Sequence, residues 1–95
     1  MHKKYDVVYS AQYRRDYKRA KKRGYDISLL DAVIELLEAG EPLPELRRDH
    51  ALTGNFAGHR ECHIASDWLL IYKIENDVLI LTLNRTGTHA DLFGM

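Results

Sequence analysis

Four segments of this chain have the apolar pattern and the composition of β-strands. Residues 5–9 are rich in β-forming side chains and predict a short first strand. Residues 61–65, 68–75 and 78–85 predict three more, separated by Ser-Asp and Asn-Asp pairs that suit tight antiparallel turns. We therefore expect the last three strands to pair with one another in antiparallel fashion.

Between the first strand and the other three, apolar residues recur at the spacing of α-helices. Tyr13, Tyr17 and Ala20 lie at i, i+4 and i+7 and form one narrow apolar stripe, with basic residues around the rest of the helix. A second stripe predicts a second helix, and its members are Leu30, Val33, Ile34 and Leu37. Two consecutive helices of this kind form an αα-hairpin.

Capping residues set the expected limits of these helices. Ser10 is a favourable N-cap for the first helix, and either Asp26 or Ser28 for the second. Gly24 and Gly40 end the two helices. The element order is therefore βααβββ, the fold class is α+β, and the whole chain, residues 1–95, is expected to be a single domain.

Two segments lack a regular apolar pattern. Residues 41–60 contain both prolines and read as a long ordered loop, a kind of segment that often carries function. Residues 86–95 form a short tail in which Thr88 can cap a single helical turn.

Charge is unevenly distributed, although the formal net charge is zero. Residues 1–25 hold nine Lys or Arg against two acidic residues, and residues 26–95 hold five against twelve. The basic helix either attracts a polyanion or is an ordinary solvated face. Without a net positive charge, tight binding to free RNA by counterion release alone is not expected.

The sequence also indicates a compartment. No run of about 18 apolar residues is present for a membrane span, and the first residues lack the apolar segment of a signal peptide. The single cysteine, Cys62, cannot form an internal disulfide, which fits a reducing environment. We expect a cytoplasmic protein without membrane association.

Histidines are the first candidates for chemistry, and metal binding is the first role to test. His50, His59, His63 and His89 lie in the long loop, at a strand start and in the tail. They lack the spacing of zinc-protease ligands, and no second cysteine accompanies Cys62, so we predict neither a metal nor another cofactor. Neighbouring strand residues point to opposite faces, so Cys62 and His63 cannot form a catalytic dyad, and Cys62 is expected in the core.

The same alternation places Glu61 and His63 together on the other face of their strand. The following turn brings Asp67 to the same end of the sheet, and the tail with His89 and Phe93 starts at the end of the last strand. RNA can be cut without a metal if a base takes the 2′-hydroxyl proton and an acid protonates the departing 5′-oxygen. Histidine suits both roles, because its ordinary pKa is about 6.5.

Each candidate also has a structural interpretation. A lone loop histidine is usually an ordinary hydrogen-bonding residue, and His59 keeps this interpretation. Trp68 leads into an apolar run and is expected in the core, although an aromatic ring can also stack on an RNA base. Arg60 and Arg85 are either surface salt-bridge residues or phosphate ligands.

Four ordered motifs resemble toxins of the YafQ-like branch of the RelE/ParE superfamily. These motifs are DHALTG (49–54), GHRECHI (58–64), DWLLIYK (67–73) and RTGTHADLFG (85–94). Residues 9–16 and the Pro42-Leu43-Pro44 loop resemble the same pattern, so that the resemblance covers nearly the whole chain. It implies a RelE-like fold, in which an antiparallel sheet of about four strands packs against two helices.

The resemblance also implies a function and a site. It implies a metal-independent, ribosome-dependent endonuclease that cleaves translated messenger RNA in the 30S A site. By the family pattern the catalytic set is His50, His63, Asp67, His89 and Phe93. We assign His50 as the general base and His89 as the general acid, although these two roles can be exchanged. His63 and Asp67 are expected to orient the reacting groups and to stabilise the phosphate charge. Contacts to substrate or phosphate are assigned to Arg60, Glu61 and Arg85.

One departure and two rival functions follow from the same comparison. Asp91 adds an acid beside His89 and would raise the pKa of His89 if the two side chains meet.

The expected partners are a cognate antitoxin, the ribosome with its messenger RNA, and operator DNA through the antitoxin complex only. The rivals are a binding toxin of the gyrase-inhibitor type, whose members lack this histidine set, and an inactive regulatory relative.

Overall fold

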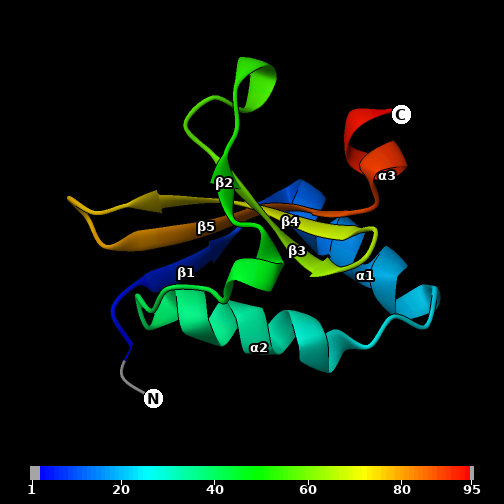
Figure 1. Cartoon of the computed structure of the whole chain (residues 1–95), viewed down its shortest axis with the longest axis horizontal. Helices are drawn as coiled ribbons and strands as arrows, with labels where there is room; N and C mark the ends of the chain where they lie inside the picture. The colour runs from blue at the N-terminus through cyan, green and yellow to red at the C-terminus, as the bar shows by residue number, and fades with distance from the viewer. Residues whose placement is uncertain (1–2, 95) are drawn as a thin grey trace.

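The computed structural model describes residues 3–94, so Met1, His2 and Met95, including the start of the segment examined for a signal peptide, lie outside the described residues. Figure 1 shows a sheet with the two longer helices on one face and a loop and a short helix rising from the other. The elements are β1 (Asp6–Tyr9), α1 (Ala11–Lys22), α2 (Ile27–Glu38), β2 (His50–Ala51), β3 (Arg60–Ala65), β4 (Trp68–Glu75), β5 (Ile80–Gly87) and α3 (His89–Phe93). Two 3₁₀ turns, Glu45–Arg47 and Gly54–Phe56, flank β2. Each helix within residues 3–94 is too short or too polar to cross a membrane.

The sheet has the strand order β1-β5-β4-β3-β2, and the α+β class is confirmed. Strands β2 to β5 pair in antiparallel fashion, as expected. The prediction of a wholly antiparallel sheet of about four strands was wrong in two details. β1 runs parallel to β5, and a short fifth strand, β2, lies inside the segment predicted as a loop. A parallel pair needs a long connection, which the helical hairpin and the strands after it provide.

The helices begin where polar side chains cap them. Ser10 Oγ accepts a hydrogen bond of 2.9 Å from the Tyr13 N–H at the start of α1, as predicted. Asp26, rather than Ser28, caps α2 and accepts the Ser28 N–H at 3.1 Å. Thr88 caps α3, so the predicted single turn in the tail is confirmed.

The main core lies between the helical hairpin and one face of the sheet. It joins the apolar stripes of α1 and α2 to alternate residues of β3, β4 and β5. Cys62 and Trp68 belong to this core, and both expectations are confirmed. A smaller cluster on the opposite face is centred on Leu69, Ile71 and Leu92. This second cluster anchors α3 to the sheet.

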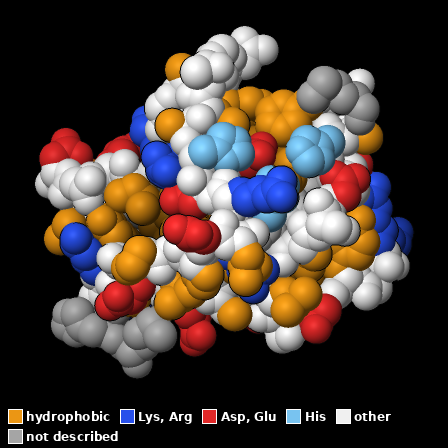
Figure 2. Space-filling view, viewed as in Figure 1, with side chains coloured by type: hydrophobic (Ala, Val, Ile, Leu, Met, Phe, Trp, Pro, Cys, Tyr) orange, Lys and Arg blue, Asp and Glu red, His pale blue; other side chains and the backbone are white. Residues whose placement is uncertain are grey.

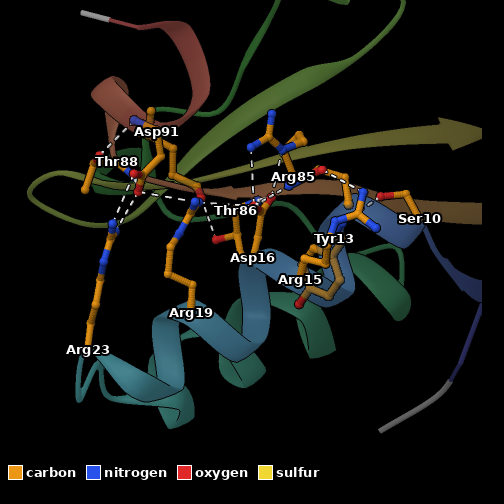
Figure 3. A network of polar contacts seen from close by, with 12 residues as sticks. Ser10, Tyr13, Arg15, Asp16, Arg19, Arg23, Arg85, Thr86, Thr88 and Asp91 are labelled. Atoms are coloured by element: carbon orange, nitrogen blue, oxygen red, sulfur yellow. Dashed lines mark hydrogen bonds and ion pairs between the residues drawn. The ribbon is translucent and has the colours of Figure 1, made fainter.

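A buried carboxylate joins α1 to the part of β5 that β1 does not cover. β1 pairs only with residues 80–83 of β5, and beyond that point α1 runs beside the strand. The Asp16 side chain is fully buried there. Its Oδ2 accepts the Thr86 N–H at 3.1 Å and the Arg85 Nε–H at 2.8 Å (Figure 3). Asp16 therefore satisfies a backbone donor at the sheet edge that would otherwise be buried without a partner.

We expect Asp16→Ala to lower the free energy of unfolding by about 3 kcal/mol, because it leaves the Thr86 N–H and the Arg85 guanidinium without their acceptor. Urea unfolding followed by circular dichroism measures the change. The matched control is Asp31→Ala on the exposed surface of α2, for which we expect a change within about 0.5 kcal/mol. Equal effects of the two substitutions would show that the buried carboxylate does not stabilise this edge.

Candidate active site

Histidine side chains gather on the face of the sheet opposite to α1 and α2. In the space-filling view of this face, pale-blue histidines lie close together beside apolar and cationic side chains (Figure 2). His50 comes from β2, His63 from β3 and His89 from the first residue of α3. His63 pairs with Leu69 on β4, and Leu69 pairs with Gly87 on β5, so the sheet register brings the tail next to His63. The rings of His63 and His89 lie 6.1 Å apart, centroid to centroid.

Asp67 holds His89 by two hydrogen bonds. Its Oδ1 lies 2.7 Å from Nδ1 of the His89 ring and accepts the His89 backbone N–H at 3.0 Å. The backbone bond, followed by the ring bond, lowers the pKa of the Asp67 carboxyl below its ordinary value. Because a carboxylate can only accept, Nδ1 is the donor. Asp67 therefore fixes the orientation of the His89 ring.

His50 is paired with Glu61 across β2 and β3. The two residues are directly opposite in the strand register, and His50 Nε2 lies 3.5 Å from Glu61 Oε1. His50 Nδ1 lies 2.7 Å from the carbonyl oxygen of Arg48, and the His50 side chain is half exposed. Glu61 is buried beneath it, with 4% of its surface exposed. His50 thus lies at the surface, next to a buried carboxylate.

His63 is half-buried and lies beside His89, on the strand that also carries Glu61. Burial is the largest influence and lowers the pKa of His63 below 6.5. The Glu61 charge opposes this shift, and positive charge on Arg48, His89 and His50 adds to it. His63 is consequently neutral at pH 7. It can accept a hydrogen bond or a proton at this pH.

An aromatic group borders the site on the side of α3. Phe93 lies 6.3 Å from the His89 ring and meets Phe56 edge-on at 5.7 Å. Phe56 in turn contacts His59 edge-on at 6.2 Å, and Nδ1 of His59 is buried without a hydrogen-bond partner among the described residues. Sequence reasoning missed Phe56, because it lies in an irregular loop without a repeating pattern.

The two arginines predicted to contact phosphate, Arg60 and Arg85, both bind carboxylates of the protein itself. Arg60 contacts both oxygens of Asp49 at 3.3 Å, and this bond is the largest cause of its raised pKa. Arg85 uses Nε and one terminal nitrogen to bind Asp16. Arg48 was missed by the sequence reasoning. It lines a hollow of about 380 Å³ together with His63 and has no ion-pair partner within residues 3–94.

Two further expectations concern the chemistry of the site. Cys62 lies on the opposite face from His63, and burial raises the pKa of its thiol to about 12, so the two do not form a dyad, as predicted. Across the part of the chain that the structure describes, no three His, Cys, Asp or Glu side chains are grouped closely enough to hold a metal ion. Asp91 does not act on His89 as expected. It binds Arg23 and Thr88, and the carboxylate that contacts His89 is Asp67.

Comparison with known proteins places this α+β domain and its histidine-rich face in a family. A family model described as bacterial toxin of type II toxin-antitoxin system, YafQ, matches residues 5–94. The chain therefore belongs to the YafQ toxin family.

Individual relatives agree with this assignment over almost their whole length. The chain is 44% identical over 90 residues to the mRNA interferase toxin YafQ of Escherichia coli K12, covering 94% of this chain and 96% of the relative. The crystal structure of YafQ from E. coli BL21(DE3) superposes with a TM-score of 0.89 at 41% identity, covering 95% and 99% of the two chains. YafQ in the E. coli DinJ-YafQ toxin-antitoxin complex gives a TM-score of 0.88 at 43% identity, covering 96% and 99%.

We expect His63 to titrate with a midpoint below pH 6.5 in an NMR titration of its ring protons, because burial disfavours the charged ring. Glu61→Gln should lower this midpoint further, since Glu61 is the group that opposes the shift. The control is Glu75→Gln at the far end of β4, which should leave the midpoint unchanged. A midpoint above 6.5 in the folded wild type would contradict the arrangement described for His63.

Proposed function

We propose that this chain is an endoribonuclease that cleaves messenger RNA, the activity named for its E. coli relative. The observation that carries the proposal is the convergence of His50, His63 and His89 on one exposed face, with a carboxylate next to two of them. This arrangement supplies a proton acceptor and a proton donor on the same surface. Both are needed to cut RNA by attack of its own 2′-hydroxyl.

The reaction that fits these groups is an in-line transfer at phosphorus. His50 Nε2 takes the 2′-hydroxyl proton, and the 2′-oxygen forms a bond to phosphorus as the bond to the 5′-oxygen breaks. His89 Nε2 gives a proton to the departing 5′-oxygen, which leaves a 2′,3′-cyclic phosphate on one fragment. Glu61 lies beside the positive charge that forms on the His50 ring, and Asp67 keeps the His89 ring oriented. No metal is required for this sequence of steps.

Residues around the histidines balance the negative charge of the phosphate and position the base. Arg48 and His63 lie beside the reacting phosphate, and Arg60 and Arg85 contribute positive charge from their positions in ion pairs. Glu61 acts through His50 rather than on phosphate, because its side chain is almost completely buried. Phe93 offers a face for base stacking, which is typically worth about 1–3 kcal/mol.

The ribosome is the proposed platform for the substrate. The chain has no net charge, and counterion release would give it little affinity for free RNA. The substrate must therefore be presented by another molecule. Messenger RNA in the 30S A site meets that need, and we assign the cleavage reaction to this location.

A cognate antitoxin is the second proposed partner. The E. coli relative was crystallised with DinJ as a toxin-antitoxin complex, which supports an equivalent partner for this chain. Exposed cations of α1, including Arg14, Lys18 and Lys21, offer a surface for acidic segments of that partner. We place the complex in the cytoplasm, where its operator DNA contacts are made through the antitoxin.

We expect wild-type protein to cut a reporter messenger RNA in a translation extract only while ribosomes are active. His50→Gln and His89→Gln should each lower the rate by about 10²–10⁴, the usual range for loss of a general acid or base. Asp67→Asn should lower it less, because the His89 ring remains present. Primer extension locates and counts the cuts.

The matched control is Asp77→Asn in the turn between β4 and β5, which should cut like the wild type. Cuts that persist without ribosomes would contradict the proposed location. If folded wild-type protein makes no cuts and translation continues, the nuclease proposal fails. Gyrase supercoiling and antitoxin-binding assays would then separate the binding toxin from the regulatory relative.

A further inference from the structure

The short helix that carries His89 and Phe93 is attached to the rest of the domain at three points. α3 has only five residues, and a helix of this length is not stable by itself in water. Leu92 anchors it to the apolar cluster of β4, and Asp67 holds its first residue. A third attachment comes from the C-terminal end of α1, from which Arg19 and Arg23 extend to Asp91 of α3 (Figure 3).

Asp91 is the residue of α3 that receives this third attachment. Arg23 binds it with two hydrogen bonds, from Nη1 to Oδ2 at 2.6 Å and from Nη2 to Oδ1 at 3.1 Å. Arg19 Nη2 approaches the same Oδ2 at 3.6 Å. A guanidinium that binds both oxygens of a carboxylate fixes its direction as well as its distance.

The same carboxylate closes the first turn of α3. Asp91 Oδ2 accepts the Thr88 N–H at 2.9 Å, and Thr88 Oγ1 accepts the Asp91 N–H at 3.1 Å, which together form a capping box. Asp91 approaches β5 closely, since a Cβ placed on Gly87 would lie 2.9 Å from its Oδ2. The Arg23 bond is also the largest cause of the strongly lowered pKa of the Asp91 carboxyl, so that this carboxyl is charged at neutral pH.

Arg19 connects this attachment to the buried edge of the sheet. Its Nη2 contacts Asp16 Oδ1 at 3.1 Å and also approaches Asp91 of α3. Because Asp16 also accepts the Thr86 N–H, α1, β5 and α3 are connected at this point. Two contacts thus hold α3. Asp67 in the β3–β4 turn binds its first residue, His89, and Arg23 at the end of α1 binds its Asp91.

We propose that Asp91 is a positioning residue for the cleavage reaction, and that its ion pair with Arg23 sets the direction in which α3 presents His89 and Phe93 to RNA. This inference rests on the proposed nuclease function. An exposed ion pair contributes little to global stability. The effect of Asp91 is therefore on the geometry of proton transfer, where a displacement of about 1 Å can lower a rate about 10²-fold.

The experiment compares Asp91→Asn, Arg23→Gln and the double variant in the ribosome-dependent cleavage assay. The asparagine side chain would keep an oxygen for the Thr88 N–H and lose the charge that binds Arg23, so that helix capping is retained. We expect each single variant to lower kcat about tenfold with KM changed less than about twofold. The double variant should be no slower than the single ones, because both remove the same contact. Arg23→Lys, which retains the charge without the two-point contact, should fall between wild type and Arg23→Gln.

Lys22→Gln is the matched control, since Lys22 is the exposed neighbour of Arg23 and has no ion-pair partner among residues 3–94. It should leave kcat unchanged. Amide hydrogen exchange gives a readout that does not depend on activity. The His89 N–H should exchange about tenfold faster in Asp91→Asn and Arg23→Gln than in the wild type, with the amides of β4 unaffected.

The outcomes separate this inference from the function on which it rests. If wild type cuts RNA and both single variants cut equally well, Asp91 is not a positioning residue. Multiplied rather than shared losses in the double variant would also overturn the inference, because the two residues would act independently. If wild type makes no cuts, the nuclease proposal fails. The hydrogen-exchange comparison then still decides whether the ion pair holds α3.

Discussion

The carboxylate of Asp16 is the interaction on which the arrangement of this toxin depends. β1 leaves the distal half of β5 as an open edge, and an open edge needs partners for its backbone groups when helices cover it. The N–H and the hydroxyl of Ser10 donate to the carbonyl oxygens of Leu83 and Asn84, and Asp16 then accepts the Thr86 N–H. α1 and its N-cap thus continue the edge pairing where β1 stops. The same contact fixes the direction in which β5 leaves the sheet towards α3.

Some arginines of the chain form ion pairs that hold the fold together, and another has no carboxylate partner among residues 3–94. Arg85 and Arg19 meet at Asp16, and Arg60 is held by Asp49, so a large part of the positive charge near the site is structural. Arg48 differs, because its left-handed backbone and exposed side chain place a cation beside His63 without a carboxylate partner within residues 3–94. Among these arginines, the side chains that form ion pairs are therefore distinct from the unpaired cation beside His63. A substitution at one arginine should not be interpreted as though all of them bound RNA.

The sequence predicted the elements well because their signals are local. Ser10, Gly24 and Gly40 fix helix limits through short-range geometry, and alternation along β3 correctly separated Cys62 from His63. The short strand β2 and the parallel placement of β1 could not be predicted, because each depends on contacts with residues far away in the sequence.

The candidate site divides in the same way. The set of histidines, Asp67 and Phe93 could be named from motifs, and their grouping follows from the order of strands. The carboxylate that contacts His89 could not be predicted. The sequence places Asp91 close to His89 along the chain, but in the structure Asp91 binds Arg23, and Asp67 binds His89. Phe56 and Arg48 were also missed, because loop residues carry no periodic signal that would reveal where they point.

The parallel pairing of β1 with β5 has a consequence for synthesis of the protein. β1 and α1 emerge from a translating ribosome before all the other described elements, yet their partners, β5 and α3, emerge after all the others. Pairings between segments so distant in sequence form late in folding, because the intervening chain must be closed into a loop first. A nascent copy therefore has neither its sheet edge nor its C-terminal helix in place. The face that groups His63 with His89 is assembled only when the chain is nearly complete.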